Sequence, residues 1–153
     1  MEIKDVDSRD LKKIVNLEQK IFKENAFSED LMERLIEKNF FFLKLEINKL
    51  KKHIIGFIIV IKEKDRKDNV NIVNFLIDSK FQNRGYGSYL LQHVIEKIKN
   101  LKIIKKIILN VQLSNTIAIT LYEKFNFKRN PLIVENYYHS GKDAYLMELN
   151  IYS

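Results

Sequence analysis

The sequence predicts a single mixed α/β domain over residues 1–153, with an antiparallel first half and a strand–helix–strand crossover in the middle. Its length is that of one ordinary domain, and no linker or internal repeat divides it. Apolar residues recur at helical spacing in several segments, and β-rich apolar runs separate those segments. Hydrophobic residues make up 46% and charged residues 31%, a globular mixture that excludes a disordered chain.

The first half contains two helical patterns followed by strand patterns. After a short strand at 1–5, Asp7 or Ser8 can cap a helix. The apolar stripe of that helix is Leu11, Ile14, Val15, Ile21 and Phe22. Ser28 can cap a second helix that continues through residues 31–36. The β-rich runs 40–47 and 54–62 predict a hairpin across 48–52, and 70–77 predicts a further strand.

The second half alternates helices and strands. Residues 85–100 predict a helix with Leu90, Leu91, Val94, Ile95 and Ile98 on one face. Residues 103–111 predict a buried strand, and Ser114 or Asn115 begins another helix. Two last strands are predicted at about 128–136 and 142–151.

Composition narrows the classes of function. The chain has no cysteine, so it has no thiolate nucleophile, and its three histidines lack the spacing of metal ligands. The longest apolar run, 54–61, is far shorter than a membrane span, and no signal peptide is visible. We therefore expect a cytoplasmic protein without a metal site or a membrane partner.

Charge is distributed unevenly along the chain. The net charge is +7, but residues 1–48 hold 9 basic and 11 acidic side chains, whereas residues 49–153 hold 18 and 9. The basic portion would attract a polyanion, either nucleic acid or a small polyphosphate.

Two of the four glycines, Gly85 and Gly87, lie in one turn between a predicted strand and a predicted helix. Free amides in such a turn and in the first turn of the helix form a cradle for an anion such as phosphate. The segment has neither the Gly-Lys-Ser/Thr ending of a Walker loop nor the third glycine of a dinucleotide fingerprint.

The run Gln82-Asn-Arg-Gly-Tyr-Gly87 resembles the acetyl-CoA pyrophosphate loop of the GCN5-related N-acetyltransferase (GNAT) superfamily. The segment Asn110-Val-Gln-Leu-Ser-Asn115, with the helix that follows it, is similar to that of N-terminal protein acetyltransferases, including ribosomal-protein alanine acetyltransferases. The tail run Asn136-Tyr-Tyr-His-Ser-Gly-Lys-Asp143-Ala-Tyr145 resembles the tail hairpin of the same subgroup. The resemblance implies a mostly antiparallel twisted sheet with a splayed parallel strand pair, flanked by four helices.

The resemblance also implies a site for acetyl-CoA. Phe75, Leu76 and Ile77 would part from the neighbouring strand and pair with pantetheine, and a backbone N–H near Ile77 would face the thioester oxygen. Asn115 suits either pantetheine or a helix cap. The loop residues that would hold the pyrophosphate are Gln82, Asn83, Arg84, Gly85, Tyr86, Gly87 and Ser88.

For the reaction, the resemblance implies Tyr122 as the general acid, which also contacts the cofactor, because a phenol stays protonated at neutral pH. Related enzymes often carry Glu or His at the position of Asn110, so the family's proton acceptor is replaced here by an amide. Phe27, Tyr137 and Tyr138 would bind the substrate peptide from two sides.

We therefore predict an acetyl-CoA-dependent enzyme that acetylates protein N-termini by direct attack in a ternary complex, with the ribosome or an auxiliary subunit as a further partner. An alternative acceptor is a small amine such as a polyamine or an antibiotic. A third hypothesis is a non-catalytic module that responds to CoA or binds nucleic acid. No specific nucleic-acid motif is present, and the lysines at 97, 99, 102, 105 and 106 lack aromatic interleaving.

Overall fold

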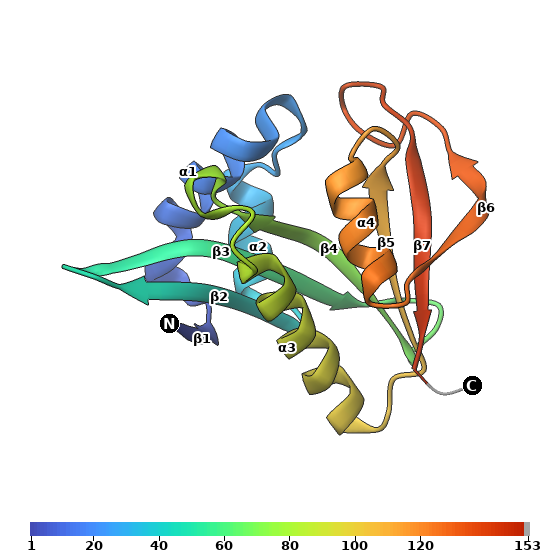
Figure 1. Cartoon of the computed structure of the whole chain (residues 1–153), viewed down its shortest axis with the longest axis horizontal. Helices are drawn as coiled ribbons and strands as arrows, with labels where there is room; N and C mark the ends of the chain where they lie inside the picture. The colour runs from blue at the N-terminus through green and yellow to red at the C-terminus, as the bar shows by residue number, and fades with distance from the viewer. Residues whose placement is uncertain (152–153) are drawn as a thin grey trace.

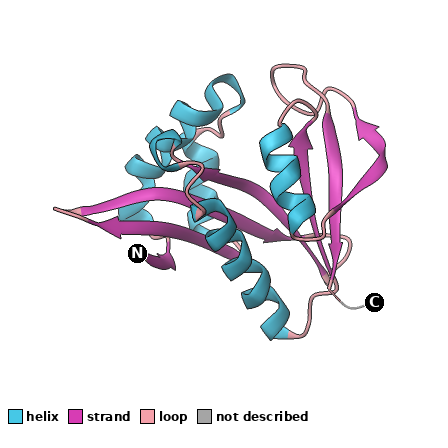
Figure 2. Ribbon diagram, in the orientation of Figure 1, coloured by secondary structure: helices cyan, strands magenta, loops and turns pink. Residues whose placement is uncertain are grey.

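The computed structural model describes residues 1–151, which form a seven-stranded sheet with helices on both faces (Figures 1 and 2). The elements follow the predicted order. The helices are α1 (Leu11–Phe22), α2 (Glu29–Glu37), α3 (Tyr86–Leu101) and α4 (Thr116–Lys124). The strands are β1 (Glu2–Asp5), β2 (Phe41–Asn48), β3 (Lys52–Lys62), β4 (Asn69–Ile77), β5 (Lys106–Gln112), β6 (Lys128–Val134) and β7 (Ala144–Asn150). The predicted mixed α/β fold is confirmed.

The order of strands across the sheet is β1-β2-β3-β4-β5-β7-β6. Strands β4 and β5 pair in parallel, and α3 connects them; every other described pair is antiparallel. The predicted crossover in the middle of the chain is therefore also confirmed.

The two faces of the sheet carry separate cores. Helices α1 and α2 lie behind the sheet in Figure 1, whereas α3 and α4 lie in front of it. Alternation along β3 supplies both cores, because Phe57 and Ile59 pack with α1 and α2, and Ile58 and Val60 pack with α3. Strand β3 thus supports α1 and α2 on one face of the sheet and α3 on the other.

Predicted capping residues act as caps, although the first of them does not cap α1 itself, whose N-cap residue is Asp10 without a side-chain bond. Asp7 caps a short 3₁₀ turn (Ser8–Asp10) that leads into α1. The Ser28 hydroxyl caps α2, and the Asn115 amide caps α4. Of the helices within residues 1–151, none is long and apolar enough to cross a membrane.

Candidate active site

Strands β4 and β5 separate partway along their length. Their register pairs run only from Asn69 with Lys106 to Ile72 with Leu109. Beyond that point β4 stays paired with β3 as far as Ile77, and β5 stays paired with β7 as far as Gln112. Each strand keeps its outer partner, so the two diverge, as the family resemblance implies.

A cleft of about 680 Å³, which we call the strand cleft, occupies this opening. Helix α1 and the start of α4 also border it. Many of the residues predicted to bind the cofactor line it: Phe75, Leu76, Ile77, Gln82, Asn83, Gly85, Gly87, Ser88, Asn115 and Tyr122. Arg84 and Tyr86 belong to the same predicted set but do not line it.

Backbone groups at the end of β4 face the opening. Asp78 N donates to Ile55 O at 2.7 Å, so these opposed residues form a hydrogen-bonded pair of the β3–β4 ladder. Hydrogen-bonded and non-bonded pairs alternate in antiparallel strands, so the N–H groups of Phe75 and Ile77 point away from β3, toward β5. The carbonyl of Ile77 accepts from Gln82 Nε2 at 2.8 Å. An extended ligand could therefore pair with Phe75 and with the Ile77 N–H.

A β-bulge lies where the two strands part. Ile59 of β3 is opposite Asn74, and Val60 is opposite Ile72, so Val73 is the extra residue on β4. Within the described strands, Val73 has no register partner on β3 or β5. The bulge thus leaves irregular backbone at the narrow end of the strand cleft.

The glycine loop opens α3 as predicted. Gly85 is the N-cap residue, in a left-handed conformation with φ of 85°, and no side chain caps the helix. An added Cβ at Gly87 would contact Leu121, Ile77 and Phe75 at 3.6–3.7 Å, and all three line the strand cleft. The first-turn amides of α3 therefore border the cleft without a side-chain acceptor, as an anion site requires.

Two loop residues are held by other contacts. The Arg84 guanidinium lies 5.7 Å from the centre of the Phe81 ring, and Tyr86 packs edge-on against the same ring. Arg84 thus remains beside the loop as a nearby positive charge, whereas Tyr86 can offer only its backbone to the cleft.

Tyr122 forms part of the α4 wall. Its ring packs between Phe75 at 6.3 Å and Phe127 at 5.7 Å, and the residue is buried. Burial raises the pKa of Tyr122 above its ordinary value, and the nearby Tyr138 adds to this rise. The phenol therefore keeps its proton throughout the neutral range. Asn115 Oδ1 accepts from Ala118 N at 3.2 Å, so its helix-capping role is present.

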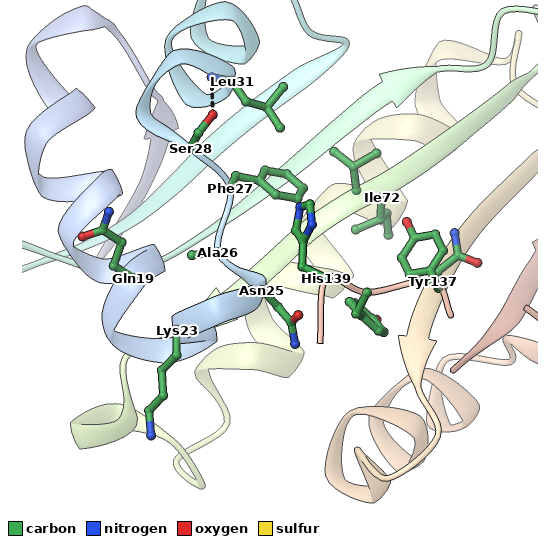
Figure 3. Close-up of a pocket in the computed structure, with 13 residues that line it drawn as sticks. Gln19, Lys23, Asn25, Ala26, Phe27, Ser28, Leu31, Ile72, Tyr137 and His139 are labelled. Atoms are coloured by element: carbon green, nitrogen blue, oxygen red, sulfur yellow. Dashed lines mark hydrogen bonds between the residues drawn. The ribbon is translucent and has the colours of Figure 1, made fainter. Parts of the chain in front are cut away.

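A second cleft, the loop cleft, has a volume of about 670 Å³. The segment between α1 and α2 and the loop between β6 and β7 form its walls. Phe27, Tyr137 and Tyr138 all line it, and the two tyrosine rings meet edge to face at 4.9 Å. Figure 3 shows Phe27 and His139 pointing toward one another from the two walls, whereas Lys23 extends away. The residues predicted to hold the peptide are thus brought together.

The two clefts meet where the strands part. Ile72, Val73 and Asn110 line both of them, as do Phe27 and Tyr138. Burial raises the pKa of Tyr138 to about 12, with a contribution from Tyr137, while a hydrogen bond with the backbone of Gln112 acts in the opposite direction. This meeting point is therefore bordered by an amide and a protonated phenol.

The sequence prediction did not place Glu18 among the site residues. It lies on α1, it is 1% exposed, and it lines the strand cleft. Burial raises the pKa of this carboxyl, partly offset by hydrogen bonds from Phe27 N and Asn74. Its position in the helix could have indicated burial, because Glu18 follows Ile14 by four positions and Val15 by three, and so lies on the apolar face of α1.

The histidines are scattered. His139 lines the loop cleft, whereas His53 and His93 line neither cleft. Residues 1–151 contain no group of three or more His, Asp or Glu side chains arranged to hold a metal ion.

The sequence matches a known protein family and several curated relatives. The Acetyltransferase (GNAT) family matches residues 11–127. The chain is 38% identical over 77 residues to an N-alpha-acetyltransferase of Sulfolobus acidocaldarius, covering 50% of this chain and 45% of that one. It is 36% identical over 87 residues to a [Ribosomal protein bS18]-alanine N-acetyltransferase of Salmonella typhimurium, covering 55% and 57%. The matched segments thus span about half the length of these relatives.

The structural likeness extends further than the sequence matches. The crystal structure of the ribosomal-protein-S18-alanine N-acetyltransferase from Escherichia coli superimposes with a TM-score of 0.85 at 26% identity, over 99% of this chain and 94% of that one. The family match covers well over half of the chain, and the fold agrees with it. The chain therefore belongs to the GNAT acetyltransferase family.

Proposed function

We propose that this protein transfers the acetyl group of acetyl-CoA to the α-amino group of a protein N-terminus, by direct attack in a ternary complex. The observation that carries the proposal is that two clefts open separately and meet between β4 and β5, at Val73 and Asn110. Such an arrangement lets an acyl donor and an amine enter from different sides and meet at one point.

The strand cleft fits acetyl-CoA. The Phe75 and Ile77 backbone groups can pair with the amides of pantetheine, as a third strand would. The first turn of α3 offers amides to the pyrophosphate, and Gly87 leaves room where a side chain would intrude. Acetyl-CoA supplies an activated thioester, and no cysteine exists to form an acyl-enzyme.

Tyr122 is the proposed general acid. The amine nitrogen forms a bond to the thioester carbon, the carbon–sulfur bond breaks, and the leaving sulfur takes the proton of the Tyr122 hydroxyl. The amine proton passes to water, and the phenol recovers its own proton from solvent. Because burial keeps Tyr122 protonated, the acid is in the required form at neutral pH.

An α-amine suits this site better than a lysine side chain. An α-amine with a pKa of about 7.7–8.0 is already ~10% neutral at pH 7, so removing its proton costs roughly 1–1.4 kcal/mol, against about 4.6 kcal/mol for lysine. Asn110 cannot accept a proton. A site without a strong base at this position therefore favours N-termini.

The lining of the loop cleft agrees with a peptide rather than a polycation as the acceptor. Ser140 N donates to Asn25 Oδ1 at 3.0 Å, which links the two walls across 115 positions of the sequence. Of the described residues that line the loop cleft, none carries a carboxylate, so a polycationic small amine lacks a counter-charge there.

The test is an acetylation assay with a library of peptides, acetyl-CoA and the full chain. We expect unblocked N-termini to be acetylated, and blocked peptides with internal lysine and polyamines to react at least tenfold more slowly. Equal rates for internal lysines would contradict the preference. Acetylation of a small amine with every N-terminus left unmodified would favour the alternative acceptor.

A further inference from the structure

The Glu18 carboxylate joins three separate parts of the site. Its Oε1 and Oε2 accept from Asn74 Nδ2 at 2.8 and 2.9 Å. Its Oε2 also accepts from Phe27 N at 3.0 Å. Glu18 belongs to α1, Phe27 to the wall of the loop cleft, and Asn74 to β4, next to the Val73 bulge. A single side chain thus connects the Phe27 wall of the loop cleft with the strand at the meeting point of the two clefts.

This carboxylate has no cationic partner. Among residues 1–151, no ion pair includes Glu18, and only burial and its two hydrogen-bonding neighbours, Phe27 and Asn74, perturb its pKa. Burying a carboxylate without a counter-ion is unfavourable, so a residue used only for packing would be apolar. The three hydrogen bonds that the carboxylate accepts partly compensate for the loss of its hydration.

We propose that Glu18 is a positioning residue for the transfer reaction, holding the Phe27 wall at a fixed distance from β4 so that the entering amine meets the acetyl group beside Val73. The inference rests on the proposed function. Its buried oxygens are engaged by the protein's own donors, so Glu18 acts through Phe27 and Asn74 rather than by touching the substrate.

The hydrogen-bonding pattern explains why a carboxylate is required. Asn74 presents an N–H₂ group, and Phe27 presents a backbone N–H, so residue 18 must accept from both. In Glu18→Gln one of the two oxygens becomes an N–H₂ group, which faces Asn74 Nδ2 at the Oε1 position, or both Asn74 Nδ2 and Phe27 N at the Oε2 position, so a donor opposes a donor in either orientation. The exchanged pair, Glu18→Gln with Asn74→Asp, restores a donor opposite an acceptor and leaves an oxygen for Phe27 N.

The experiment compares wild type, Glu18→Gln, and the double variant Glu18→Gln/Asn74→Asp by steady-state kinetics. We expect Glu18→Gln to raise the KM for a peptide N-terminus about tenfold while the Kd for CoA changes less than twofold, and the exchanged pair to recover most of the peptide KM. An equal rise in both constants, a loss of kcat at unchanged peptide KM, or an exchanged pair no better than Glu18→Gln would overturn the inference.

The Phe27 amide gives a readout that does not depend on activity or on the folding of a variant. In the wild type we expect the hydrogen exchange of this amide to be much slower than that of an exposed loop amide. Exchange at the exposed rate would show that the bond from Phe27 N to Glu18 does not hold the loop, and would overturn the inference by itself. If the wild type acetylates no peptide, the proposed function fails and the inference falls with it. An active wild type whose peptide KM is insensitive to the variants refutes the inference alone.

Discussion

Replacing Gly87 with alanine separates the stability of the protein from its cofactor affinity. Gly87 lies in the first turn of α3, and its φ is not in the positive range. An alanine Cβ would meet Phe75, Ile77 and Leu121 at ordinary contact distances of 3.6–3.7 Å. The protein alone therefore accepts the methyl group, which then occupies part of the strand cleft.

The expected magnitudes have opposite signs. Alanine is favoured over glycine inside a helix by at most ~1 kcal/mol, which corresponds to a rise of about 2–4 °C in Tm for a domain of this size. A displaced charge-assisted hydrogen bond between a backbone amide and the pyrophosphate costs about 1.5–3 kcal/mol. That loss weakens CoA binding roughly 10- to 100-fold.

Thermal unfolding without ligand and calorimetric titration with CoA measure the two effects. Gly141→Ala is the control, because Gly141 lies in the loop between β6 and β7, outside the strand cleft, and its φ of 82° is unfavourable for alanine. It should lower Tm and leave the Kd for CoA unchanged. A Gly87→Ala variant that binds CoA as tightly as wild type would refute the assignment of the phosphate site to this turn.

Three further changes test other parts of the site. Tyr122→Phe should lower kcat about 100-fold and leave both KM values nearly unchanged, because it removes only a proton donor. Steady-state kinetics measure this effect, and an unchanged kcat would exclude Tyr122 as the general acid. Gly56→Ala should destabilise the fold by about 1–3 kcal/mol in urea unfolding, because its Cβ would lie 2.7 Å from the Leu76 carbonyl oxygen, and a neutral effect would contradict the tight β3–β4 contact. The raised pKa of Glu18 means that its ionised form is unfavourable in the folded protein. The free energy of unfolding of the wild type should therefore rise relative to that of Glu18→Gln as the pH falls from neutral toward about 4.5. A pH-independent difference would show that the carboxyl is not desolvated.

Features set by neighbours in the sequence were predictable. The stripe of α1 and the capping groups Ser28 and Asn115 follow from helical spacing and the chemistry of first-turn amides. The glycine turn was predictable for the same reason, since few residues tolerate the backbone of Gly85. Local chemistry thus indicated the turn that we propose as the pyrophosphate site.

Long-range features were harder to predict. The parting of β4 and β5 depends on which outer strand each one keeps, so only the family resemblance indicated it. The link from Asn25 to Ser140 joins segments 115 positions apart, and no periodicity reports it. Glu18 was overlooked because an acid on an amphipathic helix is ordinarily exposed, and its partner Asn74 lies 56 positions away.

Asn110 stands where related enzymes often carry an ionisable residue, and the neighbouring side chains do not replace that residue as a base. Glu18 is buried beneath the acceptor wall with its oxygens engaged, and Tyr122 is held in the protonated form, so neither is suited to remove a proton at neutral pH. An amine that arrives partly neutral needs no such group, whereas one that arrives fully charged does. We therefore propose that the site prefers an amine that is already partly neutral in solution, and that the protein's contribution is to hold this amine beside the bulge of β4.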